Sequence, residues 1–219
     1  MDAVPHDQPV EVILVLDRSG SMESIWADTI GGLKAFVDEF RQSAPHARFT
    51  LVLFNDAVST LYASIPAAEV PEIKSGGELV PSNRTAMFDG ICSAIDGAGK
   101  RFAEYPEDVR SKLRVVCAII SDGIENASRE YRRDDVKQRV QRQAEQFGWQ
   151  FNYLGANQDA IVAGGGLGID AGRSAGYSAN AHGIREALVG SSKRAVDYAV
   201  CGASGAMNIS DEERRKLNQ

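Results

Sequence analysis

Residues 10–22 read VEVILVLDRSGSM, and they give the strongest indication of the fold. The first seven residues are apolar except for Glu11, which is typical of a strand that helices cover on both faces. Small and polar residues follow at once, beginning with Asp17. Ligands of α/β sheets bind beyond the carboxyl ends of the strands, so the stretch predicts a central strand followed by a functional loop.

Further strands and helices alternate along the rest of the chain. Apolar runs predict three more buried strands, at 48–54, 113–120 and 149–154. A shorter and more polar run at 59–63 predicts an edge strand. Apolar residues spaced three to five apart predict helices over 25–40, 87–102, 136–147 and 184–198. We therefore predict an α/β three-layer sandwich: a mostly parallel, doubly wound, Rossmann-like sheet with one antiparallel edge strand and helices on both faces.

The chain is predicted to form one domain over residues 9–205. Residues 1–8 are predicted to be an N-terminal tail, and residues 206–219 a short C-terminal helix or tail. The sequence Ser210-Asp-Glu-Glu is a capping box, which predicts the beginning of that helix. Residues 163–181 are rich in Gly, Ala and Ser and are predicted to be a loop that ends in a short strand.

Composition and charge exclude several classes of protein. The 219 residues are 43% hydrophobic and 25% charged, as in an ordinary globular domain. The net charge of −6 argues against nucleic acid as a partner, and the lack of an 18-residue apolar run argues against membrane insertion. The first residues have neither the basic start nor the apolar core of a signal peptide. Three widely spaced cysteines without a Cys-x-x-Cys pair are typical of reduced thiols, so we expect a cytoplasmic protein.

Polar residues gather after the predicted strands and at the beginning of the second predicted helix. The candidate metal ligands are two aspartates and three hydroxyl residues from three segments: Asp17, Ser19, Ser21, Thr85 and Asp122. We expect them to lie together, because the carboxyl ends of parallel strands meet at one edge of a sheet. Oxygen donors without Cys or His suit Mg²⁺, Mn²⁺ or Ca²⁺ rather than zinc. Mg²⁺ fits best, since it retains several waters and takes only one or two carboxylates.

This pattern resembles the von Willebrand factor A (vWA) domain and its metal-ion-dependent adhesion site. The family pattern is Asp-x-Ser-x-Ser after the first strand, a Thr in a later loop and an Asp after the central strand. All five positions are matched by the candidate ligands named above. The similarity extends over about residues 9–167, and residues 121–131 resemble bacterial cytoplasmic members of the family.

The resemblance implies that Ser19, Ser21 and Thr85 supply neutral oxygens to one divalent cation, while Asp17 and Asp122 bind it directly or through water. Such a cation attracts an acidic side chain, so the resemblance implies a metal-dependent adhesion or adaptor module whose partner is a protein that presents Asp or Glu. Binding of this kind breaks no bond, and we expect no enzymatic activity. No particular oligomeric state is indicated. The residues expected around the site are Gly20, Arg84, Gly123, Glu125 and Asn126.

Single parts of the pattern have simpler interpretations. Residues 17–21 could form only a helix N-cap, because Ser and Asp are preferred there. The Asp-Gly pair at 122–123 could form only a turn. Glu125 and Asn126 could be donors around the site or ordinary loop residues. Asn55, which follows the second buried strand, is interpreted as a turn residue.

Two other functions stay open. The chain could be a scaffold or self-association domain, with the polar run at 59–63 at its contact surface and an incidental metal. It could also be a metal-dependent phosphoester hydrolase with Asp17 as nucleophile, although Ser19 stands where such enzymes have a second Asp. The glycines at 164–168 follow a helical stretch and do not fit a dinucleotide-binding fingerprint.

Overall fold

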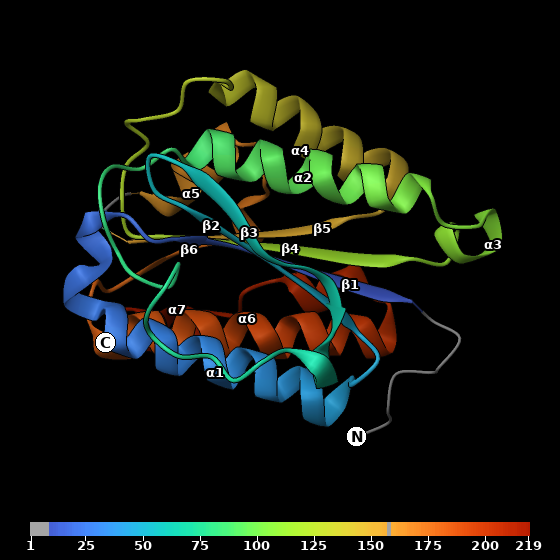
Figure 1. The fold of residues 1–219 in the computed structure, drawn as a ribbon, viewed down its shortest axis with the longest axis horizontal. Coiled ribbons are helices and arrows are strands. Elements are labelled where there is room, and N and C mark those ends of the chain that lie inside the picture. The colour runs from blue at the N-terminus through green and yellow to red at the C-terminus, as the bar shows by residue number, and fades with distance from the viewer. Residues whose placement is uncertain (1–8, 157–158) are drawn as a thin grey trace.

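The computed structural model describes residues 9–156 and 159–219, so the predicted tail over 1–8 lies outside the described residues. A six-stranded sheet lies between two layers of helices (Figure 1). Its order is β3-β2-β1-β4-β5-β6, with β3 antiparallel to β2 and every other neighbouring pair parallel. The predicted three-layer α/β fold is confirmed.

The strands lie where the apolar runs predict them. Their bounds are β1 (Val10–Asp17), β2 (Arg48–Phe54), β3 (Val58–Pro66), β4 (Arg114–Ser121), β5 (Gln150–Ala156) and β6 (Ser174–Tyr177). Every residue of β1 and of β5 is buried, because helices cover both faces of these strands. Most of β3 is partly exposed, which confirms the predicted edge strand.

Helices α1 and α6 cover one face of the sheet, and α2 and α4 cover the other (Figure 1). The helix bounds are η1 (Gly20–Ile25), α1 (Trp26–Ser43), η2 (Ala67–Glu69), α2 (Met87–Ala103), α3 (Glu107–Arg110), α4 (Arg133–Phe147), α5 (Ala160–Gly166), η3 (Ala171–Arg173), α6 (Ala181–Cys201), η4 (Ser204–Met207) and α7 (Asp211–Leu217). The four predicted helices are confirmed, with ends displaced by a few residues. Each helical layer encloses its own apolar core against the sheet.

The prediction of a loop over residues 163–181 is wrong at its beginning, where α5 forms instead. The Asp159 carboxylate accepts hydrogen bonds from the backbone N–H groups of Ile161 and Val162, which caps the helix. A Cβ on Gly164 would lie 2.2 Å from Oγ of Ser174 in β6. The glycine is therefore present because helix and strand approach closely, and not because the segment is a loop. The predicted short strand is β6.

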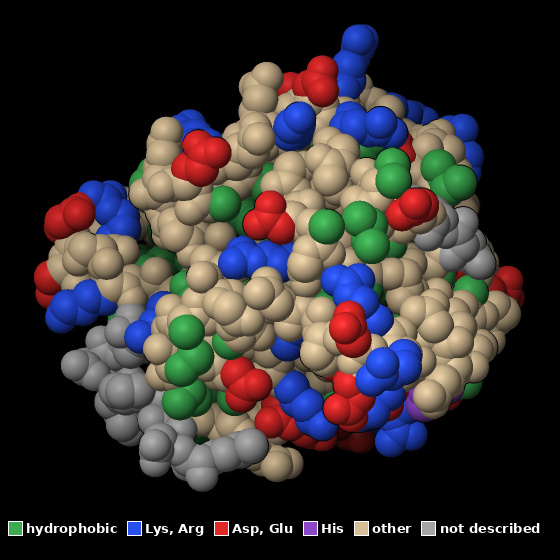
Figure 2. Space-filling view, turned by 180° about the vertical axis from the view of Figure 1, so that it is seen from behind, with side chains coloured by type: hydrophobic (Ala, Val, Ile, Leu, Met, Phe, Trp, Pro, Cys, Tyr) green, Lys and Arg blue, Asp and Glu red, His purple; other side chains and the backbone are tan. Residues whose placement is uncertain are grey.

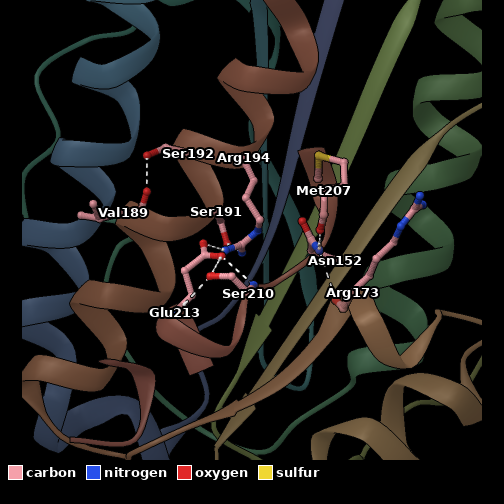
Figure 3. Close-up of polar contacts among 9 residues, drawn as sticks. All are labelled: Asn152, Arg173, Val189, Ser191, Ser192, Arg194, Met207, Ser210 and Glu213. Atoms are coloured by element: carbon pink, nitrogen blue, oxygen red, sulfur yellow. Dashed lines mark hydrogen bonds and ion pairs between the residues drawn. The ribbon is translucent and has the colours of Figure 1, made fainter. Parts of the chain in front are cut away.

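The C-terminal segment packs onto the domain through polar contacts (Figure 3). The capping box is present: Ser210 Oγ accepts from the Glu213 backbone N–H, and the Glu213 carboxylate accepts from the Ser210 backbone N–H. The same carboxylate is 2.6 Å from a guanidinium nitrogen of Arg194, a side chain in α6 that is only 5% exposed. Asn152 Nδ2, in β5, donates to the Met207 carbonyl. These contacts connect α7 to α6 and η4 to the sheet.

Candidate metal site

Asp17 is the last residue of β1, and its carboxylate is fixed from two sides. Oδ1 accepts a 2.7 Å hydrogen bond from the Ser19 backbone N–H, and Oδ2 accepts a 2.5 Å bond from the Ser121 hydroxyl. The second bond depends on the sheet, because β1 and β4 are neighbours with Leu16 opposite Ile120. Asp17 is fully buried, so its position is determined by two strands together.

A row of hydroxyls continues from Asp17 towards Asp122. The Oγ atoms of Ser19 and Ser21 are 3.0 Å apart, and Ser21 Oγ donates to Asp122 Oδ1 at 2.7 Å. Ser19 stands at the N-cap position of η1, but its side chain makes no capping hydrogen bond. Helix capping therefore does not explain the hydroxyl of Ser19, which takes part in the row instead.

Thr85 comes to this edge through a loop that is held by the backbones of the segments directly after β1 and β2. The Ser82 N–H donates to the Arg18 carbonyl at 2.8 Å, and the Gly20 N–H donates to the Asn83 carbonyl at 3.0 Å. The Ala86 N–H donates to the carbonyl of Asn55 at 2.5 Å. Thr85 is 3% exposed as a result. The loop is thus attached at three points before α2 begins.

Gly123 marks the point where Thr85 and Asp17 approach each other. A Cβ on Gly123 would lie 2.9 Å from Thr85 Oγ1 and 3.6 Å from Asp17 Oδ2. The structure therefore brings the five candidate ligands together at one edge of the sheet: hydrogen bonds connect Asp17, Ser19, Ser21 and Asp122, and Thr85 lies beside Gly123. Only a residue without a side chain leaves room between Thr85 and Asp17.

Glu125 and Asn126 hold the beginning of α2 and Thr85. Asn126 Oδ1 accepts from the Thr85 backbone N–H at 3.0 Å, and the Asn126 N–H donates back to the Thr85 carbonyl at 3.0 Å. Glu125 Oε2 accepts from the Phe88 N–H at 3.0 Å, and Oε1 accepts from the Ser128 N–H at 2.7 Å. Of the two interpretations left open for this pair, the contacts favour a positioning role beside the site.

Arg84 is exposed and forms no ion pair or hydrogen bond among the described residues. Gly20 takes part through its backbone, by the bond to Asn83 described above. Neither residue contributes a side chain to the row of oxygens. Both lie on the segments that bring the row together.

The site contains two buried carboxylates, and no cationic side chain among the described residues forms an ion pair with Asp17. Burial raises the pKa of Asp17 to about 6, and burial also raises the pKa of Asp122. The Tyr177 hydroxyl is buried without a hydrogen-bond partner, and burial together with the charges of Asp122 and Asp17 raises its pKa.

A divalent cation fits this site. Buried carboxylates are normally paired with positive charge, and Asp17 lacks such a partner. Within the described residues, no three His, Cys, Asp or Glu side chains come together as a conventional metal cluster. The candidate therefore depends on neutral hydroxyl oxygens around two carboxylates, which is the donor chemistry of Mg²⁺.

Three residues near the site were not among the site residues predicted from the sequence. Ser121 holds Asp17, and its only signal was its place directly before Asp122. Asn55 forms the predicted turn through Oδ1, which accepts from the Ala57 N–H, but its carbonyl also anchors the Thr85 loop. Tyr177 lies far along the chain in β6, so only the folded sheet brings its hydroxyl near the aspartates.

The comparisons with known proteins establish the fold. No protein-family model matches the sequence, and no curated protein matches it. Among solved structures, the fold resembles proximal thread matrix protein 1 from the mussel byssus, with a TM-score of 0.60, 15% identity, and coverage of 88% of this chain and 47% of that one. It also resembles a von Willebrand factor type A protein from Catenulispora acidiphila, with a TM-score of 0.58, 17% identity, and coverage of 86% and 43%.

A third similar structure is the pilus adhesin SpaC from Lactobacillus rhamnosus GG in its open conformation. Its TM-score is 0.64 at 14% identity, with coverage of 89% of this chain and 31% of the adhesin. This chain spans less than half the length of each of the three proteins. At these identities the likeness shows the fold alone, and that fold is the α/β fold of vWA domains.

Proposed function

We propose that this chain, which has the vWA fold, is a metal-dependent protein-binding module with a complete metal-ion-dependent adhesion site. One divalent cation, Mg²⁺ in preference to Mn²⁺ or Ca²⁺, would be held there and would capture an Asp or Glu of a partner protein. A single observation carries the proposal: two buried carboxylates and three hydroxyls from three loops meet at the carboxyl edge of the sheet. The residues are Asp17, Ser19, Ser21, Thr85 and Asp122.

The hydroxyls and the carboxylates have different roles in such a site. Ser19, Ser21 and Thr85 offer neutral oxygens, so they would hold a cation without cancelling its charge. Asp17 and Asp122 supply the negative charge that draws a cation in. A bound cation would contribute positive charge and an open coordination position for a carboxylate. Ser121 keeps the Asp17 carboxylate oriented by donating to Oδ2.

The surroundings of the site support a protein as the partner. Of the five large hydrophobic side chains that are exposed in the described residues, four lie in segments near the carboxyl edge of the sheet. They are Val80, Ile124, Ile161 and Val162, with exposed fractions between 45% and 70%. Exposed apolar side chains at one end of a domain are typical of a protein contact.

The charge distribution gives no support for nucleic acid as the partner. Figure 2 shows the molecule from behind the view of Figure 1, and on this side Lys and Arg side chains are interspersed with Asp and Glu. The net charge is −6. No helix in the described part of the chain has the length and apolarity needed to cross a membrane.

We propose binding rather than catalysis at this site. Among the described residues, no Lys or Arg forms an ion pair with Asp17, so no cationic side chain contacts it to hold a phosphate group. The hydroxyls of Ser19 and Ser21 bond to each other and to Asp122. Of the described histidines, His46 follows α1 and His182 begins α6, and neither is among the residues that contact the hydroxyl row.

The proposal includes a cytoplasmic location, as in the bacterial members that residues 121–131 resemble. The three cysteines support it, since Cys92, Cys117 and Cys201 are all free thiols. Free thiols persist in a reducing compartment. Fractionation of cells that produce the protein tests this part, and recovery outside the cytoplasm would contradict it.

Thermal unfolding with Mg²⁺, Mn²⁺ or Ca²⁺ tests the site itself. At ~100 times the dissociation constant, a bound ligand adds about 2.7 kcal/mol to the free energy of unfolding. For a domain of this size, the melting temperature should rise by roughly 5–10 °C. Asp17→Ala should abolish the rise.

Asp56→Ala is the matched control, because Asp56 is an exposed aspartate that directly follows β2 at the same edge. This variant should retain the full rise in melting temperature. An absent rise with all three ions, or an equal rise in Asp17→Ala, would sink the proposal. Once the rise is established, competition by acetate or by an acidic peptide tests the capture of a carboxylate.

A further inference from the structure

A cavity lies at the end of the molecule opposite the candidate metal site. It has a volume of about 920 Å³ and lies between α2 and α4, above the amino ends of β4 and β5. The short helix α3 projects beside it at the end of the domain (Figure 1). We call this cavity the α2–α4 groove. Cavities of roughly 300–1,000 Å³ are typical of small-molecule sites.

The floor of the α2–α4 groove is apolar and aromatic. Phe102, Val115 and Trp149 line it, and each of these side chains is at most 5% exposed. The rings of Phe102 and Trp149 meet edge to face, with centroids 5.6 Å apart. Phe147, the last residue of α4, adds a wall that is 51% exposed. The rings of Phe102 and Trp149 are thus covered within the core, and Phe147 is the aromatic side chain that the groove offers to a ligand.

Gly99 keeps the groove open on the side of α2. A Cβ placed on this glycine meets no atom within 4 Å, so the space beside it is empty. A glycine within a helix costs roughly 0.5–1 kcal/mol relative to alanine. Packing does not require the glycine here, in contrast to Gly164, and a larger residue would narrow the groove.

The rim of the groove is positively charged. Its two carboxylates are already paired: Asp96 with Arg139, at 2.9 Å, and Glu107 with Arg110. Two further rim cations, Lys100 and Arg142, pair with no acidic side chain among the described residues. Unpaired cations beside an aromatic floor complement an anion, although the protein as a whole carries a charge of −6.

We propose that the α2–α4 groove binds a small organic anion with an aromatic body. The aromatic body packs on the exposed ring of Phe147, and its carboxylate or sulfonate lies between Lys100 and Arg142. This site is independent of the proposed metal site, because the full length of β4 separates the two.

Energy transfer from Trp149 to anilinonaphthalene sulfonate tests the groove, since this probe is an aromatic anion. Trp26→Phe leaves Trp149 as the only tryptophan and serves as the parent protein. The folded parent should bind the probe saturably, at one site. In the parent, Lys100→Ala/Arg142→Ala should weaken binding by at least about tenfold, which corresponds to about 1.4 kcal/mol. Gly99→Leu should abolish it.

The melting temperature of Gly99→Leu shows whether lost binding is caused by lost structure. Gly99→Leu removes a helical glycine, and its Cβ meets no atom within 4 Å, so its melting temperature should equal or exceed that of the parent. Arg185→Ala/Lys193→Ala, which removes two exposed cations from α6 on the other face, should bind the probe as tightly as the parent. Unchanged binding in Gly99→Leu, or probe fluorescence that develops only as the protein melts, would overturn the proposal.

Discussion

At the scale of the residue, Gly123 decides whether Thr85 and Asp17 can share one space. A Cβ there would press on Thr85 Oγ1 at 2.9 Å, which is closer than real Cβ contacts allow. The hydroxyl would have to move away from the Asp17 carboxylate. A single added methyl group should therefore separate two of the proposed ligands without removing either.

Gly123→Ala should lower the affinity for the divalent cation by at least about tenfold, that is, by about 1.4 kcal/mol. Gly123→Ala should also lower the free energy of unfolding by about 1–3 kcal/mol, as overpacking ordinarily does. Titration of the melting temperature with Mg²⁺ measures both quantities. Gly165→Ala is the control, because a Cβ there meets nothing within 4 Å. Equal affinity in the two variants would contradict the proposed position of Thr85.

Glu11 is the one charged residue within the otherwise apolar part of β1, residues 10–16. Its carboxylate accepts from the hydroxyls of Ser64 and Tyr105, and the cations nearest to it are Arg48 and Arg101. Burial raises its pKa, and these neighbours only partly offset the effect. A carboxyl group with a raised pKa favours the folded state below its ordinary pKa, and this contribution is lost as the pH rises through the raised value.

Glu11→Gln should therefore gain stability relative to the wild type as the pH rises from about 4.5 to about 7.5. The amide resembles the protonated carboxyl and does not titrate. Urea unfolding of both proteins across this range gives the difference in free energy. A difference that is flat, or that shifts in favour of the wild type as the pH rises, would show that the pKa of Glu11 is not raised.

Among the secondary-structure elements, α2 begins in an unusual way: side chains from the loop after β4 accept hydrogen bonds from backbone N–H groups at its beginning. The segment after β4 supplies Asn126 to Thr85 and Glu125 to the first turn of α2, so a neighbouring loop and not the helix's own N-cap satisfies these groups. The beginning of α5 is satisfied locally, by Asp159. Two helices that begin near the same edge therefore depend on different kinds of support.

Asn126→Ala and Asp159→Ala separate these two kinds of support. Each variant should lose about 1–2 kcal/mol of unfolding free energy, since each removes side-chain acceptors of backbone N–H groups. Only Asn126→Ala should also reduce the rise in melting temperature that Mg²⁺ produces, because Asn126 contacts Thr85. If both variants respond fully to Mg²⁺, Thr85 does not need this support.

At the scale of the whole molecule, α7 is attached by an ion pair that spans the C-terminal segment (Figure 3). Arg194 is 5% exposed, and burial lowers its pKa. The pKa of Glu213 is also lowered: burial would raise it, but the Ser210 N–H and the Arg194 charge outweigh that effect. The pair thus holds two charges together where solvent is scarce.

Glu213→Ala should lower the free energy of unfolding by about 3–5 kcal/mol, because it leaves the buried Arg194 without its partner. Glu212→Ala is the matched control, since Glu212 is exposed and its ion pair within the described part of the chain is with Lys216, one turn away. Its cost should be about 0.5 kcal/mol or less. Chemical denaturation of the two variants measures the difference, and equal costs would show that α7 is not attached through this pair.

Much of the fold could be predicted from the sequence because apolar runs and helical spacing are local signals. The buried strands and the four long helices follow from them. The error at α5 has a different origin: Gly164 indicates a loop when it is considered alone, whereas in the fold it allows contact with Ser174 in β6. A requirement imposed by a distant strand leaves no signal in the neighbouring sequence.

The α/β architecture and the candidate ligand types can be predicted from residue order, because the apolar strands and the residues after each strand are local features of the chain. How those residues meet depends on the folded sheet. Ser121 bonds to Asp17 because β4 lies beside β1, and Tyr177 comes near the aspartates because β6 belongs to the same sheet. The α2–α4 groove likewise exists only where two packed helices leave space. Such contacts depend on distances between segments far apart in the chain, which residue order alone does not specify.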